Sequence, residues 1–341
     1  MGGKVKLRNV HPTLKTWLRA QNTAYGMASA ARTWFVDDVS GDDSYAGWDD
    51  PASAKKTIGA AIDGANAWDV IYIAPRAWTS GNLWYGTPYQ EATTDLSIVY
   101  AKQGLALVGI GHQGLAGVPH GTAVTELSAS TNPILKVHAP MVAIENLCFV
   151  RGGTAINSLY FYGDVAGTSE AALGSVYNCA FHYGTGSGAT GDTGGALYGH
   201  AVWGLTVDQC YFMDCRVGIS VKSDAATAGK FVLRNLDFTT RMTTATNISC
   251  DIYVYTQGSA CVQIYNVNCG HVIPTYSGGH GRYILINADV RAGCIHNVAM
   301  GVAADTTTAL TVGPAGTGIL CPAGLIAVGA IYSEGAAAAW A

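Results

Sequence analysis

The chain has 341 residues, of which only 12% are charged and 49% are apolar, with 43 glycines. A charged fraction near half the usual share, combined with so many apolar residues, excludes a disordered chain and disfavours a helical bundle. Six of the 19 basic residues precede Asp37, the first acidic residue, so 13 basic and 23 acidic residues follow. The acidic body is unsuited to tracking a phosphate backbone, so a nucleic acid could contact only the basic arm, and we do not favour such a partner.

The first 32 residues form a basic arm. Within it, residues 11–21 predict a short amphipathic helix, because Pro12 suits a first helical turn and apolar residues share one face. Such a short helix is not stable alone and must pack on its own chain or on a neighbour. We therefore expect the arm to dock on an acidic protein surface through six residues, Lys4, Lys6, Arg8, Leu14, Trp17 and Leu18.

No secretory signal is recognisable in the arm, since its first apolar run is broken and lacks a small-residue cleavage site. No segment qualifies as membrane-spanning either. The least charged stretch, 306–333, is interrupted by Pro314, Pro322 and several glycines, which favours packed β structure. We expect a protein without a membrane partner.

A repeat runs through the middle of the chain. Six segments align on an amide residue: VAIENLCF (142–149), GSVYNCAF (174–181), LTVDQCYF (205–212), FVLRNLDF (231–238), VQIYNVNC (262–269) and CIHNVAM (294–300). The amides are Asn146, Asn178, Gln209, Asn235, Asn266 and Asn297, spaced by 32, 31, 26, 31 and 31 residues. An aliphatic residue lies two positions before each amide, and a small or branched apolar residue follows it. A β-sandwich would instead show hairpin turns at shorter intervals.

The alternation around each amide predicts two short strands joined by a sharp bend. Asparagine tolerates the left-handed conformation of such a bend, and its side chain can hydrogen-bond to the equivalent residue one repeat away. Stacked repeats then enclose a continuous apolar interior. The pattern predicts an all-β chain folded as a parallel β-helix, with an amide ladder of Asn146, Asn178, Asn235, Asn266 and Asn297.

The stretch WFVDDVSGDDSYAGWDDPASAKKTIGAAIDGANAWDVIYIAP (34–75) resembles the entry segment of the pectin-lyase-like right-handed β-helix proteins. In that superfamily an opening strand leads to a Gly/Asp turn, a helix that caps the coil, and the first rung. The resemblance implies a capping helix over 51–65, with Ile58, Ala61 and Ile62 on its buried side, and a right-handed coil of about 8 or more rungs. We place the β-helix at 33–305 and an apolar C-terminal assembly segment at 306–341.

A catalytic site in such a fold would lie on the outer wall. One outward column is Glu145, Tyr177, Asp208, Arg234, Tyr265 and His296, and the column past the bend is Cys148, Ala180, Tyr211, Asp237, Asn268 and Ala299. Two rungs separate Glu145 from Asp208, about 9.6 Å at about 4.8 Å per strand, near the upper limit for inverting glycosidases. Asp208, Arg234 and Asp237 are expected to cluster. The simpler interpretation, which we favour, is a solvated face with a salt bridge.

Motifs for a metal or a cofactor are absent from the sequence. The nine cysteines form no C-x-x-C pair and the nine histidines no H-x-x-x-H pair. The turn with Asp37, Asp38, Asp42 and Asp43 lacks the D-x-D-x-D-G spacing of a calcium loop. We predict reduced thiols used as core residues, and neither a metal nor a cofactor.

Two functions remain open. The superfamily that the chain resembles includes phage tailspikes. This resemblance implies a structural virion protein, a homotrimeric β-helix that decorates or cements a phage capsid and contacts other virion proteins through its arm. The alternative is a carbohydrate-active β-helix, a tailspike depolymerase or polysaccharide lyase that binds a host surface polysaccharide. In the second case Glu145, Asp208, Arg234 and Asp237 would carry the reaction. A short chain without a separate particle-binding domain favours the first.

Overall fold

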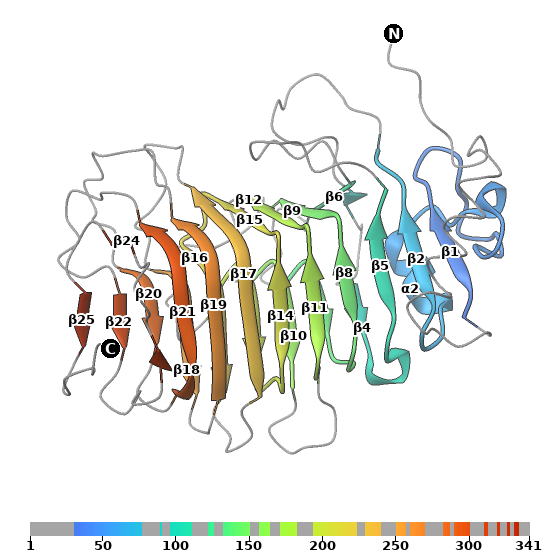
Figure 1. The fold of residues 1–341 in the computed structure, drawn as a ribbon. Coiled ribbons are helices and arrows are strands. Elements are labelled where there is room, and N and C mark those ends of the chain that lie inside the picture. The colour runs from blue at the N-terminus through green and yellow to red at the C-terminus, as the bar shows by residue number, and fades with distance from the viewer. Residues whose placement is uncertain are drawn as a thin grey trace, which may run out of the picture.

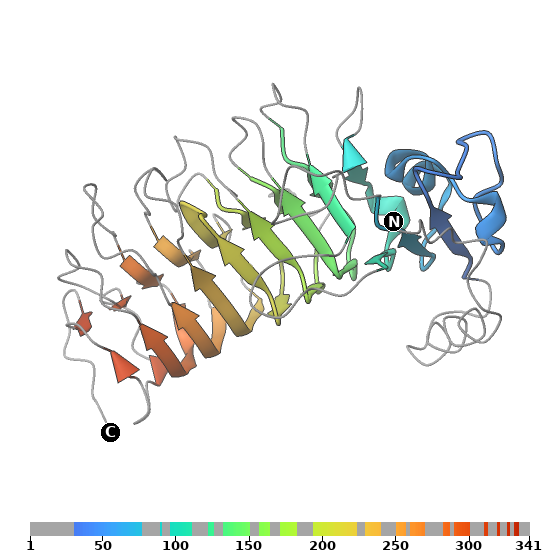
Figure 2. The same ribbon diagram turned by 90° about the horizontal axis from the view of Figure 1, so that it is seen from above.

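The computed structural model describes residues 31–76, 89–90, 96–110, 122–125, 132–150, 157–163, 171–182, 194–223, 229–239, 250–256, 260–269, 282–286, 290–300, 310–312, 319–320, 326–327 and 331–333. Within these ranges the chain is mostly β-strand, and every pairing between named strands is parallel. The strands lie side by side in a long stack that Figure 1 shows from one side and Figure 2 from above.

The larger sheet has sixteen strands in two stacks that merge. The first stack is β1 (Thr33–Val36), β2 (Val70–Ile73), β5 (Ala106–Gly109), β8 (Ala143–Glu145), β11 (Gly174–Tyr177), β14 (Leu205–Asp208), β17 (Lys230–Thr239), β19 (Ala260–Cys269), β21 (Val290–Met300) and β23 (Ile319–Leu320). The second stack is β3 (Tyr89–Gln90), β6 (Thr122–Thr125), β9 (Leu147–Val150), β12 (Ala180–His182) and β15 (Tyr211–Met213), which joins β17; β24 (Ile326–Ala327) pairs with β21.

The smaller sheet has nine strands, again in the order in which the chain visits them. They are β4 (Leu96–Ile98), β7 (Leu135–Val137), β10 (Leu159–Tyr162), β13 (Leu197–His200), β16 (Val217–Ser223), β18 (Cys250–Thr256), β20 (Arg282–Ile286), β22 (Leu310–Val312) and β25 (Ile331–Ser333). Between β8 and its partner β11 the chain passes through β9 and β10, so one circuit visits all three stacks. This arrangement is consistent with a parallel β-helix, and the parallel pairing continues through Ser333.

The interior is a continuous apolar column. Ile144, Val176, Val207, Leu233, Ile264 and Ile295, the aliphatic residues two positions before the amides, are all fully buried. Behind the bend, the register places Phe149, Phe181, Phe212 and Phe238 opposite one another. Their rings stack at centroid distances of 5.1, 4.8 and 4.8 Å with interplanar angles of 12° or less. The strand spacing thus brings phenylalanines from successive repeats into face-to-face contact.

The helix at the β1 end is shorter than predicted. Instead of one helix over 51–65, a 3-10 turn η2 (Pro51–Ser53) precedes α2 (Ile58–Gly64). The intervening residues are extended because Lys55 bridges to β1 and the Asp43 carboxylate accepts hydrogen bonds from the Lys56 and Thr57 amides at 2.8 and 2.9 Å. Ile58, Ala61 and Ile62 are buried, as the sequence predicted, and α2 contacts β1, β2 and β4. A second 3-10 turn, η3 (Tyr100–Lys102), follows β4.

The outer edge of β1 is covered by the segment that precedes α2. The Phe35 amide donates to the Gly47 carbonyl at 2.9 Å, and the Lys55 amide donates to the Phe35 carbonyl at 2.8 Å. The Asp37 amide donates to the Lys55 carbonyl at 2.9 Å. The backbone groups of β1 that do not pair with β2 are thereby satisfied within the chain.

Residues 1–30 of the basic arm lie outside the described residues. Its six expected contact residues, Lys4, Lys6, Arg8, Leu14, Trp17 and Leu18, and most of the apolar tail are therefore still predictions.

Candidate functional site

The strand register aligns the residues of the two columns that the sequence predicted, but Cys148 and Ala180 of the second column are buried rather than outward-facing. Glu145 lies opposite Tyr177 and Tyr177 opposite Asp208, and the same column continues through Arg234, Tyr265 and His296. Past the bend, Cys148, Ala180, Tyr211, Asp237, Asn268 and Ala299 are aligned in the same way. The candidate carboxylates are therefore spread over two columns on different sides of the bend.

Asp208 and Arg234 form the central contact of the wall. The Arg234 Nε and Nη2 atoms both lie 2.7 Å from Asp208 Oδ2, and Nη1 donates to the Tyr265 hydroxyl at 3.0 Å. The second carboxylate oxygen of Asp208 accepts from Asn235 Nδ2 at 2.7 Å. These two hydrogen bonds, to Tyr265 first and to Asp208 second, raise the pKa of Arg234 above its ordinary value. Asp208 is 7% exposed, so most of its hydrogen-bonding capacity is directed to neighbouring strands.

Glu145 does not join this contact. Tyr177 occupies the strand between Glu145 and Asp208, is 39% exposed, and donates from its hydroxyl to Gln209 Oε1 at 3.0 Å. Glu145 itself is half-buried, and burial raises the pKa of its carboxyl. The two acids are thus separated by an aromatic side chain and differ in environment.

Asp237 belongs to the other column. It lies opposite Tyr211 and Asn268, and its Oδ1 accepts from Asn268 Nδ2 at 3.2 Å. The chain turns at Asn235, so side chains before and after it point to different walls. Of the expected group of three, the structure brings together Asp208 and Arg234 by direct contact.

The amides occupy the bend and have left-handed backbones throughout. We call this row the amide corner: Asn146, Asn178, Gln209, Asn235, Asn266 and Asn297, with φ between 50° and 55°. Asn178 donates to Asn146 at 2.6 Å, Asn266 to Asn235 at 3.0 Å and Asn297 to Asn266 at 2.6 Å. At Gln209 the row is interrupted, because Asn235 donates to Asp208 instead. Asp208 therefore replaces the missing asparagine side chain in the ladder.

Aromatic side chains on the outer face of the smaller sheet were missed by the sequence analysis. Tyr160 stacks on Tyr198 with centroids 5.1 Å apart, and Tyr162 contacts His138 at 5.1 Å and His200 at 5.8 Å. Tyr160 and Tyr198 are stacked face to face at 16°, whereas Tyr162 meets His138 edge-on at 66° and His200 at a tilt of 38°. The shared alternation of LYFY (159–162) and LYGH (197–200) is the signal that could have revealed them.

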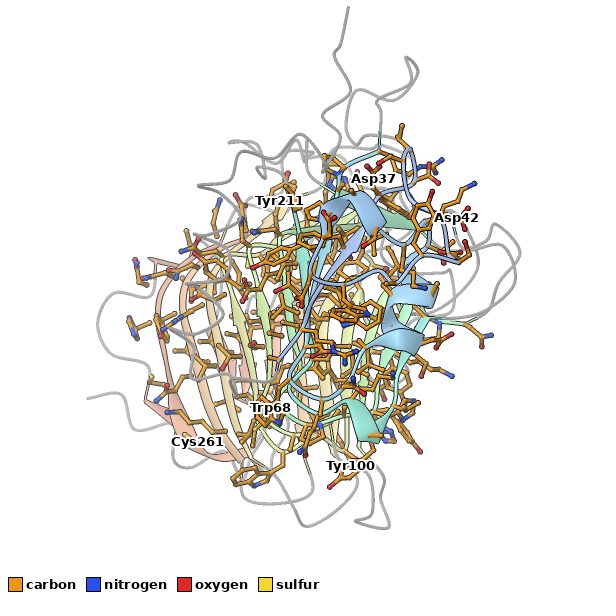
Figure 3. All side chains as sticks on the ribbon, turned by 90° about the vertical axis from the view of Figure 1, so that its right-hand side faces the viewer. Asp37, Asp42, Trp68, Tyr100, Tyr211 and Cys261 are labelled. Carbon is orange, nitrogen blue, oxygen red and sulfur yellow. The ribbon has the colours of Figure 1, made fainter. Side chains whose placement is uncertain are left out.

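Three of the four aspartates of the entry turn accept hydrogen bonds from backbone amides, whereas Asp38 pairs with Arg76 at 2.8 Å. Asp37 accepts from the Val39 amide at 2.9 Å, Asp43 accepts from Thr57, and Asp42 accepts from the Ser44 amide at 2.8 Å. The hydrogen bond from Ser44 lowers the pKa of Asp42. Figure 3 shows Asp37 and Asp42 at the periphery of the β1 end. Within the described ranges, no group of three or more His, Cys, Asp or Glu residues could hold a metal ion.

A comparison with known protein families, curated proteins and solved structures finds no match to this chain. Among the residues that the structure describes, no helix is long and apolar enough to cross a membrane.

Proposed function

We propose that the chain is a structural protein of a phage particle, a tailspike-like β-helix that decorates or cements a capsid. The observation that carries the proposal is that the carboxylates of the outer wall form contacts between adjacent strands. Asp208 bridges Arg234 and Asn235 between adjacent strands, and Asp237 accepts from Asn268 on the next strand. Polar groups committed to contacts between strands stabilise a rod and leave little for substrate chemistry.

Finer features of this proposal come from the sequence. They are a right-handed coil of the pectin-lyase-like kind with about 8 or more rungs, a capping role for α2, and assembly as a homotrimer. The arm over 1–32 would anchor the protein to other virion components, and the protein would be located in the particle.

The test is the copy number of the protein in purified particles, measured by quantitative mass spectrometry against the shell protein. We expect an abundance comparable to that of the shell protein. A copy number matching a few tail appendages would support a tailspike instead. Absence from any particle would overturn the virion proposal.

Carbohydrate cleavage is the second candidate, favoured by one feature. Glu145 is a half-buried acid with a raised pKa beside the exposed ring of Tyr177, as a proton donor next to a sugar-stacking platform would be. Wild type and the double variant Glu145→Gln, Asp208→Asn would be compared on host surface polysaccharide. Cleavage by wild type that the folded variant loses would support an enzyme, and no cleavage by wild type would remove this candidate.

A further inference from the structure

A row of exposed apolar side chains follows one edge of the stack. Nine large apolar residues are conspicuously exposed within the described ranges, and five of them lie where the chain passes from the smaller sheet to the first stack of the larger sheet. These five, which we call the apolar corner, are Val99 (47% exposed), Tyr100 (52%), Met141 (47%), Leu173 (49%) and Trp203 (48%). Figure 3, which looks along the stack, places Tyr100 at the lower edge, opposite the entry turn.

Backbone hydrogen bonds fix the alignment of the row. The Gly104 amide donates to the Pro140 carbonyl at 2.9 Å, and the Met141 amide donates to Ala172 at 2.7 Å. The Leu173 amide then donates to Trp203 at 3.1 Å. Successive turns are therefore in register at about the strand spacing of 4.8 Å, with Met141 and Leu173 at equivalent positions and Trp203 one residue before the next equivalent position, Gly204. Val99 and Tyr100 precede Gly104, the equivalent position of their own turn, by five and four residues.

Charge is nearly absent from this line. The turn segments 139–142, 171–174 and 201–204 contain no charged residue. The ammonium of Lys102, at one end, is held by the Asp63 and Ala65 carbonyls at 2.9 and 2.6 Å, and Lys230 follows the other end. A nucleic acid would require clustered basic groups, and an acidic glycan would require them too. The line accepts an apolar, uncharged partner without burying an unpaired charge.

The backbone conformation is an independent reason to expect that these side chains contact a partner. Met141 and Leu173 have φ of 59° and 56°, in the left-handed region that bulky side chains disfavour. At the same places in neighbouring turns the chain has Gly104 and Gly204, with φ of 70° and 89°. Large, half-exposed apolar side chains thus occupy positions where glycine would remove the strain.

We propose that the apolar corner is where copies of this chain meet, an inference that rests on the proposed homotrimer. A second copy supplies what the line requires, because it has the same uncharged side chains at the same spacing. Rotation about an axis parallel to the stack brings equivalent residues to equal heights, so the two lines match without adjustment. The two half-exposed aromatics present on the order of 200 Å² between them. That area suits the apolar centre of an interface of about 800 Å² per partner.

The experiment measures molar mass by light scattering and sedimentation over a range of concentrations. The variant Met141→Asn, Leu173→Asn removes two apolar side chains and introduces residues that tolerate a left-handed backbone. We expect wild type to associate and the variant to dissociate at least tenfold more readily. The matched control is Tyr45→Asn, at an exposed residue (44%) far from the corner, which leaves association unchanged.

A second variant, Trp203→Gln, keeps the test valid if the double variant fails to fold, because Trp203 is half-exposed and is not among the residues with positive φ. Wild-type association that both folded variants retain would overturn the corner proposal while leaving the trimer in place. A wild type that is monomeric at all concentrations would overturn the corner proposal and the trimer, whereas the role in a particle is judged separately by copy number.

Discussion

The amide corner and the apolar corner have the same left-handed backbone conformation but opposite kinds of side chain, polar at the first and apolar at the second. Each requires a left-handed residue as the chain turns into the next strand. At the amide corner, Asn178 donates to Asn146 along the stack and satisfies polar groups inside the molecule. At the apolar corner, Met141 and Leu173 point half of their surface outward. The comparison indicates that one corner stabilises the single chain, whereas the other is available to a partner.

The largest effect is expected for the core behind the amide corner. Phe181 is fully buried between Phe149 and Phe212, with ring centroids 5.1 and 4.8 Å away. Phe181→Ala should lower the free energy of unfolding by about 3–5 kcal/mol, because it removes buried surface and leaves a cavity. Urea unfolding followed by circular dichroism measures this. Tyr177→Ala, on the exposed wall, is the control, and an equal loss there would contradict the assignment of the core.

The next largest effect is expected for the amide itself. Asn178→Ala should cost about 2 kcal/mol, because alanine is strained at φ of 50° and cannot donate to Asn146. Asn178→Gly removes only the hydrogen bond, since glycine accepts this conformation, so its cost should be about half as large. Equal costs for the two variants in urea unfolding would show that the left-handed bend contributes nothing.

Substitutions of Asp208 test how much its contacts with Arg234 and Asn235 stabilise the chain where the amide ladder is interrupted at Gln209. Asp208→Asn keeps an acceptor for Asn235 but loses the charged contact with Arg234, so we expect a loss of about 1 kcal/mol that shrinks at high salt. Asp208→Ala removes both contacts and should cost more. A loss that is the same at low and high salt would argue against a role for the ion pair.

The apolar corner should respond with little change in the stability of the single chain. Met141→Gly removes a half-exposed side chain and also a left-handed strain of about 1–2 kcal/mol, so the two effects offset each other within about 1 kcal/mol. Unfolding at a concentration low enough to keep the protein monomeric is the measurement. A loss of unfolding free energy as large as that of Asn178→Ala would mean that both corners stabilise the single chain to the same extent.

Glu145 should give a small effect that depends on pH. Its pKa is raised by burial, so the folded state favours the protonated acid, and its contribution to stability is present below the ordinary pKa and decreases as pH rises through the raised value. The side chain introduced by Glu145→Gln stays neutral at all pH values, so the stability of this variant relative to wild type should increase as pH rises through that window. Urea midpoints at pH 4 and pH 7 compare the two proteins, and a constant difference would contradict the assignment.

The sequence predicted the features that depend on strict alternation. The interior residues, the alignment of the two columns and the left-handed amides follow from a period of two around each Asn, and the structure has them. Cys148 and Ala180, expected to face outward, are buried. The prediction that the helix begins at residue 51 was wrong, because α2 begins at Ile58. Lys55 pairs with β1 and the Asp43 carboxylate accepts a hydrogen bond from the Thr57 amide, and these long-range contacts are not encoded in local helix propensity. Of the expected group, Asp208 and Arg234 are in direct contact, and Asp237, past the bend, accepts from Asn268; its clustering with the other two stays a prediction.

The apolar corner could not be found in the same way. Its equivalent positions, Gly104, Met141, Leu173 and Gly204, share no residue type that would align them. No polar residue marks the left-handed position there, so the alignment depends on backbone hydrogen bonds that only a structure shows.

The covered edge of β1 has a consequence for how these molecules can associate. An open stack of parallel strands is a template on which another chain can add strands, as in amyloid fibrils. Here the segment around Gly47 and Lys55 already occupies the hydrogen-bonding groups of the first strand. Growth by strand addition is therefore blocked at this end, so copies of the chain cannot form a fibre that extends from β1.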